Sequence, residues 1–366
     1  MTQDFSRYHR QMLLAGFGEQ GQRKLAESTA VVLGCGALGT VIADMLARAG
    51  VGHLVLVDRD FVELTNLQRQ VLFDEADVAD ALPKAEAAKA KLARINSQVR
   101  VTAIVDDANA DNIEHLTAGA HVLVDGLDNF ETRYLANDCA VKHGIPYVYG
   151  GAVATVGTAF AILPHTPAGD SPWEQLPGGS RATPCLRCLF EEAPPPGTGA
   201  TCDTVGVIGP AAAIVANFAT AEALKVLTGN FERVSPTMLS FDLWSNTFRQ
   251  LKVARAYEQG DCPCCKHGKF EYLEGSKGSG AATLCGRDAV QLRQKRDGGG
   301  EIDLAEVAGR LESHGAVKVN RFMLRASLVE RGQPYELTLF PDGRAIVKGT
   351  QEPNVARSLY AKFVGS

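Results

Sequence analysis

Short apolar runs alternate with amphipathic helical patterns through the first part of the chain. Runs of β-branched and aliphatic residues predict five buried strands, at residues 29–33, 53–57, 100–105, 121–124 and 146–149. Apolar positions with helical spacing predict helices between them, at residues 39–49, 84–95 and 132–143. This alternation is typical of a parallel sheet with helices on both faces, so we expect an α/β, Rossmann-like fold.

The loop after the first predicted strand has a glycine pattern that suits phosphate binding. Three glycines lie in the sequence Gly-Cys-Gly-Ala-Leu-Gly, directly before a helix: Gly34, Gly36 and Gly39. Glycines allow a tight turn there, and the N–H groups at a helix N-terminus attract phosphate. Asp58 follows the second strand, where a carboxylate can meet a ribose hydroxyl, and Asp60 lies close behind. Because ligands of such sheets lie beyond the carboxyl ends of the strands, we expect Gly34, Asp58 and Asp128 to converge on one crevice.

Two segments rich in Pro, Gly and Ser are predicted to lie outside regular elements. Residues 164–184, which include Trp173, predict a long surface loop. Residues 275–280 separate an expected main domain, at residues 1–270, from a smaller domain at residues 281–366. The smaller domain is predicted to be α+β, from a strand, a helix, further strands and a last helix. Their predicted ranges are 289–292, 304–314, 321–329, a hairpin of 335–340 with 345–348, and 354–363.

Composition and charge describe an ordinary globular protein. Of 366 residues, 45% are hydrophobic and 22% are charged. A net charge of −5 gives no overall attraction to nucleic acid, so an anionic ligand must be held by local cations. The most apolar helical segment, residues 207–227, contains Asn217, Glu222 and Lys225, which favours a buried helix over a membrane span. With no signal-peptide pattern, we expect a cytoplasmic protein with neither a nucleic-acid nor a membrane partner.

Two basic residues favour a triphosphate over a dinucleotide. Arg69 and Lys84 follow Asp58 along the chain. A nicotinamide cofactor needs neither cation there, whereas attack at phosphorus builds charge on oxygens that fixed cations must meet. Surface charges that bind nothing are the alternative interpretation. The chain has no Gly-x-x-x-x-Gly-Lys-Ser/Thr sequence, so ATP would not be bound by a P-loop.

Acidic residues after the strand at 121–124 are candidates for a metal. Asp128 is placed to hold Mg²⁺, which binds one or two carboxylates together with phosphate oxygens. Asp125 competes for that role on spacing alone. Asp128 or Asn129 would alternatively cap the helix that follows.

Nine cysteines without a secretory signal favour metal or thiol chemistry over disulfides. Two Cys-x-x-Cys turns can supply four thiolates to a tetrahedral zinc, namely Cys185, Cys188, Cys262 and Cys265. Redox activity is the alternative, and Cys264 is left outside the two pairs. Cys202 follows a Pro-Gly-rich stretch and precedes an apolar helix, whose positive end would activate a thiolate. A small buried residue is the other interpretation of Cys202.

Together these residues resemble the ThiF/MoeB/HesA family, the bacterial relatives of ubiquitin-activating enzymes. The resemblance covers roughly residues 5–268. Residues 128–133 and 147–151 are more similar to the thiamine-type branch than to the molybdopterin type. The family resemblance rests on these stretches: Arg7-Tyr8-x-Arg10-Gln11, residues 34–39, Asp58-Arg59-Asp60, Asn66-Leu67-Gln68-Arg69-Gln70, Pro83-Lys84, Asp128-Asn129, both cysteine pairs and Thr201-Cys202.

The resemblance implies an ATP-dependent adenylyltransferase, with Mg²⁺ and structural zinc. Its partner would be a small ubiquitin-like sulfur carrier whose C-terminal Gly-Gly is activated for thiocarboxylate formation in thiamine thiazole biosynthesis. The implied roles are ribose binding by Asp58, phosphate contacts by Asn66, Arg69 and Lys84, Mg²⁺ binding by Asp128, and covalent or sulfur-transfer chemistry by Cys202. Arg10 would reach the ATP of a partner subunit, which implies a homodimer.

The chain also departs from the family pattern. Extra residues between Arg69 and Lys84 mean that the intervening loop must bring Lys84 back to the site. The tail has no cysteine loop typical of a sulfurtransferase, so a separate sulfur-donor enzyme is expected. The alternatives are a molybdopterin-type adenylyltransferase, a NAD-dependent oxidoreductase, and a module that binds a ubiquitin-like partner without catalysis.

Overall fold

The computed structural model describes residues 4–166, 170–192, 205–277, 283–284, 289–292, 302–330 and 332–364. The chain divides into two compact units, of which the larger ends at Lys277 and the smaller contains the residues from Gly278 onward. Each unit has its own sheet and its own apolar core.

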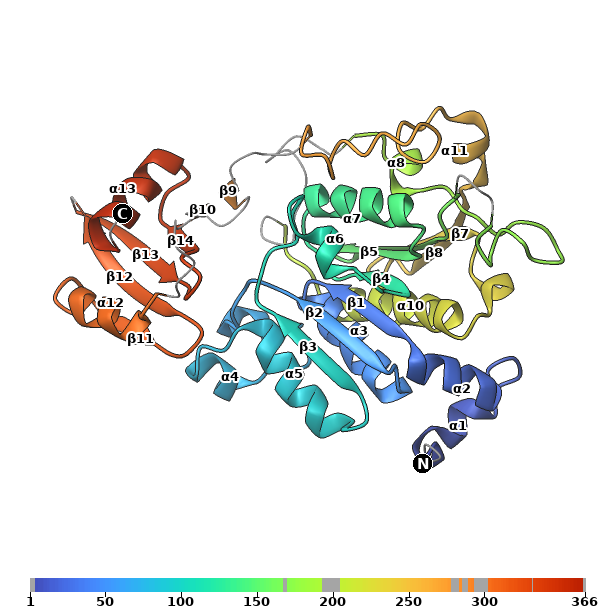
Figure 1. The fold of residues 1–366 in the computed structure, drawn as a ribbon, viewed down its shortest axis with the longest axis horizontal. Helices are drawn as coiled ribbons and strands as arrows, with labels where there is room; N and C mark the ends of the chain where they lie inside the picture. Colours follow the sequence, from blue (N-terminus) through green and yellow to red (C-terminus); the bar gives the residue numbers. More distant parts are fainter. Residues whose placement is uncertain are drawn as a thin grey trace. The chain divides into compact units, whose positions relative to one another are not determined.

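The larger unit is built on an eight-stranded sheet with the strand order β3-β2-β1-β4-β5-β6-β7-β8 (Figure 1). Strands β1 to β5 pair in parallel, as the strand–helix alternation predicts, whereas β6, β7 and β8 add an antiparallel extension. The strands are β1 (Thr29–Leu33), β2 (His53–Val57), β3 (Arg100–Ile104), β4 (Val122–Asp125), β5 (Tyr147–Val153), β6 (Val156–Ile162), β7 (Thr237–Asp242) and β8 (Thr247–Lys252).

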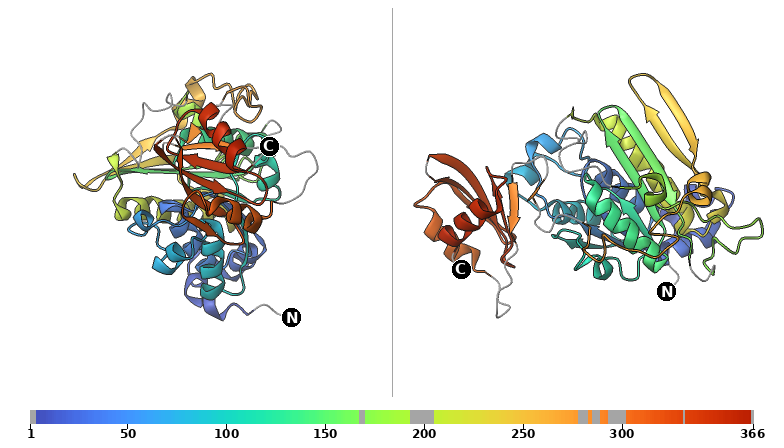
Figure 2. Two further views of the ribbon diagram at one scale, coloured as in Figure 1. Left: turned by 90° about the vertical axis from the view of Figure 1, so that its left-hand side faces the viewer. Right: turned by 90° about the horizontal axis from the view of Figure 1, so that it is seen from above.

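The antiparallel extension is absent from the sequence prediction. Every residue of β8 is exposed, so this strand carries no alternation of apolar and polar positions. Figure 2 shows the β7–β8 hairpin at the edge of the sheet. In β6, Gly157 leaves room for the ring of Phe241 on β7, since a Cβ atom there would lie under 3.0 Å from that ring. Because these strands contain small and exposed residues, their sequences lack the apolar pattern that predicts a strand.

Helices cover both faces of the sheet, as expected. Along β1, Ala30 and Val32 pack in one apolar cluster with α3, α5 and α10, whereas Val31 and Leu33 pack in a second cluster with α6 and α7. This follows from the two-residue period of a strand. The helices of this unit are α1 (His9–Met12), α2 (Gly18–Glu27), α3 (Ala37–Ala49), α4 (Glu75–Ala79), α5 (Lys84–Ile95), α6 (Ile113–Leu116), α7 (Phe130–His143), α8 (Leu186–Leu189), α10 (Gly209–Leu227) and α11 (Ala254–Gln259).

Helix α10 is the apolar segment singled out from the sequence. Among the described residues it is the one helix long and apolar enough to cross a membrane by length and composition. However, 56% of that stretch is buried inside the protein, and α10 packs against α3, β5 and β6. The expectation of a core helix is therefore confirmed.

The first described residues are tied to the far end of α3. The side-chain amide of Gln11 donates a hydrogen bond to the carbonyl of Ala49, at 2.7 Å, where α3 ends. The ring of Tyr8 fills the space beside Gly50, whose φ of 88° is left-handed. A side chain at Gly50 would collide with that ring, so the glycine both ends α3 and admits Tyr8.

The loop at residues 164–184 is only partly the surface loop that its composition predicts. Trp173 is 5% exposed and its ring lies 5.5 Å from that of Phe231. The indole N–H donates to the carbonyl of Pro164, at 2.8 Å. A buried aromatic residue with a satisfied polar atom anchors this loop to the main core.

In the part that the structure describes, the smaller unit has a six-stranded antiparallel sheet and two helices, in agreement with the predicted α+β order. Its strand order is β11-β12-β13-β14-β10-β9, and its core includes Leu324, Ala326 and Leu328 of β12. The short strands β9 and β11 were not predicted. The elements are β9 (Thr283–Leu284), β10 (Ala289–Leu292), α12 (Leu304–Leu311), β11 (Val317–Val319), β12 (Leu324–Glu330), β13 (Gln333–Leu339), β14 (Ala345–Lys348) and α13 (Pro353–Phe363).

Replacing the buried tryptophan tests its anchoring role. Trp173→Ala is expected to lower the free energy of unfolding by about 3–5 kcal/mol, because it leaves a cavity and removes the bond to Pro164. Trp244→Ala is the matched control, since Trp244 is 79% exposed and should change stability by about 0.5 kcal/mol or less. Urea denaturation of both variants measures the difference. Equal stabilities would show that Trp173 does not anchor the loop.

Candidate nucleotide and metal sites

The glycine loop between β1 and α3 is shaped by close backbone contacts. Gly34 has a φ of 91°, and a Cβ atom there would lie 2.5 Å from the carbonyl oxygen of Gly126. A Cβ atom at Gly39 would lie under 3.0 Å from the carbonyl oxygen of Gly34. A Cβ atom at Gly36, the N-cap of α3, would meet only the carbonyl oxygen of Gly126, at 3.8 Å, so the space before the helix is less crowded there. The first N–H groups of α3 lack intrahelical acceptors, so this space suits an anion.

Asp58 fixes this loop against the end of β2. One carboxylate oxygen accepts from the N–H of Cys35, at 2.6 Å, and the other accepts from the N–H of Asp60, at 2.7 Å. Burial raises the pKa of Asp58, and the ammonium of Lys84 opposes that effect. The sequence predicted a ligand contact for Asp58, and these bonds add a structural role that it did not reveal.

Lys84 reaches the same place despite the extra residues before it. Its side chain is 5% exposed, and its Nζ lies 3.2 Å from Oδ2 of Asp60. The backbone N–H of Lys84 also donates to the carbonyl of Asp60, at 2.8 Å, so α5 begins at the end of β2. The departure from the family spacing therefore does not remove Lys84 from the site.

Arg59, which the sequence analysis named in the Asp58-Arg59-Asp60 motif without giving it a role, lies beside this pair. Arg59 Nη1 is 2.5 Å from Oδ2 of Asp107, in the loop after β3. Although burial disfavours its charge, Asp107, Asp60 and Asp128 raise the pKa of Arg59. Its position next to Asp58 was the only available signal. Arg59 thus joins the ends of β2 and β3 among acidic groups.

Asn66 and Arg69 lie on the segment that leads away from Asp60. The side-chain oxygen of Asn66 is buried and accepts from the N–H of Glu63, at 3.1 Å, in a capping box. Half-buried Arg69 donates from Nη1 to the carbonyl of Thr65, at 2.9 Å. A Cβ atom at Gly209 would lie 3.1 Å from the carbonyl oxygen of Gln68, so this segment packs on the start of α10.

The structure separates the acids after β4 into different roles. Asp128 is exposed, whereas Asn129 caps α7 by accepting from the N–H of Thr132, at 2.9 Å. Asp125 is fully buried, and its oxygens accept from Leu127, Arg133 and Tyr147. Burial raises the pKa of Asp125, and Arg133 opposes that effect. Asp128 is therefore the exposed acid at the end of β4, whereas the carboxylate of Asp125 is enclosed.

Strands β2, β1 and β4 are neighbours in the sheet, so the residues at their carboxyl ends converge. Gly34, Asp58 and Gly126 meet there through the contacts described above, and Asp128 follows directly. Arg10 does not join them, because its segment is bound to the C-terminal end of α3. The 13 residues of α3 place that end about 20 Å from the glycine loop.

Four cysteines, two beside α8 and two after α11, come together in a second site. Cys185 Sγ lies 3.8 Å from that of Cys188 and 3.6 Å from that of Cys262. Cys188 and Cys265 are 3.3 Å apart, and all four sulfur atoms lie within 4.8 Å of one another. Tetrahedral coordination with metal–sulfur distances of about 2.3 Å needs sulfur separations of about 3.8 Å. The four thiols thus fit one metal ion.

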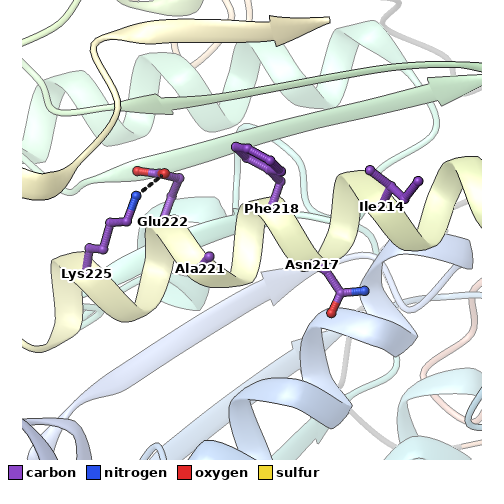
Figure 3. A pocket seen from close by; sticks show the side chains of 6 residues that line it. All are labelled: Ile214, Asn217, Phe218, Ala221, Glu222 and Lys225. Atoms are coloured by element: carbon purple, nitrogen blue, oxygen red, sulfur yellow. Dashed lines mark hydrogen bonds and ion pairs between the residues drawn. The ribbon is translucent and has the colours of Figure 1, made fainter. Parts of the chain in front are cut away.

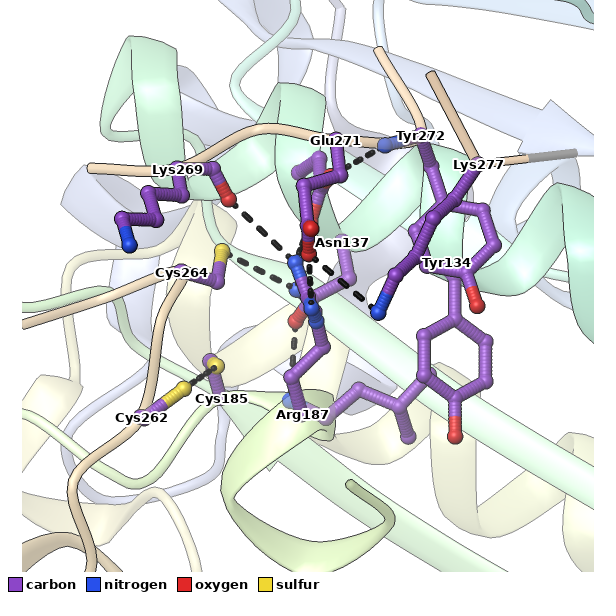
Figure 4. Close-up of polar contacts among 12 residues, drawn as sticks. Tyr134, Asn137, Cys185, Arg187, Cys262, Cys264, Lys269, Glu271, Tyr272 and Lys277 are labelled. Atoms are coloured by element: carbon purple, nitrogen blue, oxygen red, sulfur yellow. Dashed lines mark hydrogen bonds and ion pairs between the residues drawn. The ribbon is translucent and has the colours of Figure 1, made fainter. Parts of the chain in front are cut away.

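The surroundings of the cysteines support a structural site. Hydrogen bonds among the thiols lower the pKa of Cys185 and raise the pKa of Cys188, so one thiolate is stabilised by its neighbours. Cys264 lies outside the tetrad and accepts a hydrogen bond from the amide of Asn137, at 3.4 Å. Buried Arg187 donates to Glu271 Oε2, at 2.6 Å, and to the carbonyl of Lys269, at 3.2 Å (Figure 4). These bonds tie residues 269–271 to the cysteine turn.

A groove on α10 contains none of the predicted site residues. A groove of about 340 Å³ lies along the outward side of α10, between Ile214 and Lys225 (Figure 3). Its charged groups, Glu222 and Lys225, pair with each other at 2.5 Å. Cys202 lies outside the residues that the structure describes, so its predicted role has no structural account.

Comparison with known proteins identifies the family of this chain. The sequence profile of the ThiF family matches residues 8–264. The chain belongs to the ThiF family. It is 44% identical to "Sulfur carrier protein ThiS adenylyltransferase" of Bacillus subtilis, over 98% of this chain and 99% of that protein. The family resemblance of the sequence is therefore confirmed.

Two other comparisons cover the larger unit. "Sulfur carrier protein adenylyltransferase" of Thermus thermophilus is 38% identical over 72% of this chain and 91% of that protein. A crystal structure of E. coli MccB with succinimide has a TM-score of 0.58 and 23% identity. It covers 72% of this chain and 75% of MccB, and at this identity it supports the α/β fold alone.

Gly39→Ala tests the geometry of the glycine loop. The added Cβ atom would displace the Gly34 carbonyl, so we expect a loss of about 1–3 kcal/mol in stability and about tenfold weaker binding of ATP. Gly178→Ala is the control, because nothing lies within 4 Å of a Cβ atom there. Calorimetric titration with ATP measures both variants. Unchanged binding by Gly39→Ala would place the nucleotide elsewhere.

Proposed function

We propose that this chain transfers AMP from ATP to the C-terminal glycine carboxylate of a small ubiquitin-like sulfur carrier ending in Gly-Gly. The observation that carries the proposal is the convergence of the glycine loop, Lys84 with Asp60, and exposed Asp128 at the ends of adjacent strands. The similarity to adenylyltransferases over almost the whole chain supports the same activity. Membership of this family disfavours the NAD-dependent oxidoreductase considered from the sequence.

The reaction joins two anions. An oxygen of the carrier carboxylate attacks the α-phosphorus, the bond from that phosphorus to the bridging oxygen breaks, and pyrophosphate leaves with the bonding electrons. The product is an acyl-adenylate. Fixed cations lower the barrier by meeting the charge that develops on the phosphate oxygens. We assign this role to two cations of the chain, Lys84, which is held by Asp60, and Arg69, which is held by Thr65. Asn66 lies on the same segment as Arg69.

Mg²⁺ would be held by Asp128 and by phosphate oxygens of ATP. Mg²⁺ in nucleotide sites usually binds one or two carboxylates, and Asp128 is an exposed carboxylate at the end of β4. When bound, this ion neutralises phosphate charge. Asp58, at the end of β2, is assigned to the ribose, and Asn129 keeps α7 in place below Asp128.

Later steps belong to other groups. A separate sulfur-donor enzyme converts the acyl-adenylate to a thiocarboxylate, with release of AMP, and Cys202 takes part after adenylation. The name of the Bacillus subtilis relative favours the thiamine branch over molybdopterin. We assign residues 1–270 to adenylation, place the chain in the cytoplasm, and leave the domain at residues 281–366 without a role.

A homodimer would complete the site. Arg10 is exposed and belongs to the segment bound at the far end of α3, about 20 Å from its own glycine loop. Its assigned contact with ATP therefore has to be made in the site of a second copy. Arg10 would supply a cation that each chain lacks in its own crevice.

Arg69→Ala tests the adenylation assignment. Loss of one preorganised cation typically costs about 10²–10³ in rate, so carrier-dependent exchange of pyrophosphate with ATP should fall by that factor. Arg94→Ala is the control, because Arg94 is exposed at the opposite end of α5 from Lys84. Circular dichroism checks the fold of both. A wild-type exchange rate in Arg69→Ala would refute the assigned role.

Zinc is proposed to be structural and bound by Cys185, Cys188, Cys262 and Cys265. Metal analysis of reduced protein should find about one zinc per chain, absent in Cys185→Ser and retained in Cys139→Ala. Because bound metal adds to folding free energy, chelation should lower the melting temperature while the affinity for ATP stays constant. Freshly purified protein without zinc would contradict the assignment.

A further inference from the structure

A buried ion pair lies directly behind the proposed nucleotide site. Asp125 at the end of β4 is 0% exposed, and Arg133 in α7 is 7% exposed. Arg133 Nε lies 3.0 Å from Oδ2 of Asp125, and the hydroxyl of Tyr147 donates to the same oxygen, at 2.8 Å. The guanidinium also lies over the rings of Phe130 and Tyr149, with its carbon 5.6 Å and 5.5 Å from their centres. Because Asp125 and Arg133 are buried, they do not contact a ligand directly, and any effect on the site passes through the residues that they bind.

Both members of the pair hold the same residue. The N–H of Leu127 donates to Oδ1 of Asp125, at 2.8 Å, and Nη2 of Arg133 donates to the carbonyl of Leu127, at 2.6 Å. Leu127 is the residue immediately before Asp128. Nη2 of Arg133 also donates to the carbonyl of Gly150, at 3.0 Å, which ties this loop to β5. The direction in which the chain enters Asp128 is thus fixed by hydrogen bonds on both sides of Leu127.

The same loop supports the glycine turn. A Cβ atom at Gly126 would lie under 3.0 Å from the carbonyl oxygen of Gly34, and the N–H of Gly126 donates to the carbonyl of Leu33, at 2.8 Å. On the other side, Asn129 caps α7. The loop therefore has little freedom between the phosphate turn and the helix.

We propose that Arg133, together with Asp125 and Tyr147, is a positioning residue that sets Asp128 at the distance from the glycine loop required by a metal–nucleotide complex. This inference rests on the proposed function. The planar fork of Arg133 reaches Asp125, Leu127 and Gly150 at once, which the single ammonium of lysine cannot reproduce with the same geometry. Replacing a residue that orients a metal ligand typically lowers metal affinity or activity about 10–100-fold.

The test uses the full chain and a matched pair of tyrosines. Tyr147→Phe removes only the hydroxyl that bonds Asp125. Tyr134→Phe removes an equally buried hydroxyl, on α7, that donates to the carbonyl of Phe190, at 2.8 Å. Mn²⁺ is titrated into each protein with a non-hydrolysable ATP analogue and followed by electron paramagnetic resonance. Tyr147→Phe and Arg133→Lys should bind Mn²⁺ about tenfold more weakly than wild type, and Tyr134→Phe should match wild type.

A double-mutant cycle separates positioning from general destabilisation. In an Asp128→Ala background, Tyr147→Phe should cause no further loss of Mn²⁺ affinity, because the residue it positions is gone. Additive losses of Mn²⁺ affinity, or equal effects of Tyr147→Phe and Tyr134→Phe, would overturn the inference. If the wild-type protein still binds the analogue and Mn²⁺ in that case, the proposed function is unaffected. Wild-type protein that binds neither the analogue nor Mn²⁺ would overturn both.

Discussion

The close approach of two backbone loops, at Gly34 and Gly126, is the constraint on which the nucleotide site depends. These residues end neighbouring strands, and a side chain at either position would collide with the carbonyl group of the other. The contact brings the turn before α3 against the loop that leads to Asp128. Asp58 holds the same turn from the side of β2 through the N–H of Cys35. Three strand ends are thereby fixed with respect to one another by two main-chain loops and the Asp58 carboxylate.

The charged side chains of the candidate nucleotide site lie around these fixed strand ends. Asp60 and Asp107 each hold a cation, Lys84 and Arg59 respectively, so the basic groups are oriented before any ligand arrives. A cation that is already held in place loses little conformational freedom when it meets phosphate. Preorganisation of this kind has a cost, because both cations are largely buried. The acidic partners offset the loss of hydration.

The parallel part of the fold and the cysteine cluster could be predicted, because short sequence patterns indicate both. Runs such as residues 29–33 and 53–57 are apolar throughout, and paired Cys-x-x-Cys turns have few other uses. Strand β8 could not be predicted, because its residues are all exposed and show no alternation. Trp173 was misjudged as part of a surface loop because composition does not reveal the distant Phe231 that covers it.

The residues of the candidate site also divide into those that local motifs predict and those that only the folded structure reveals. The glycines, Asp58 and Lys84 follow from motifs, whereas Arg59 with Asp107 and Arg133 with Asp125 depend on contacts between separate elements. Asp125 was a candidate metal ligand on spacing, and only its three donors show that its oxygens are occupied. Spacing identifies which residues stand near a strand end but not which of them turn inward.

The cysteine tetrad also defines a loop in the topological sense. Cys185 and Cys262 are 77 positions apart, and the chain between them contains α10, β7 and β8. A metal at the tetrad would close that stretch into a ring and so reduce the number of conformations open to the unfolded chain. Because the entropy lost on closing a loop grows with the logarithm of its length, closing this long ring should stabilise the fold somewhat more than closing a short one. The exposed β7–β8 hairpin lies within this ring, and Cys262 follows Lys252, the last residue of β8, by ten positions. A metal at the tetrad would therefore hold the chain close to the exposed edge of the sheet.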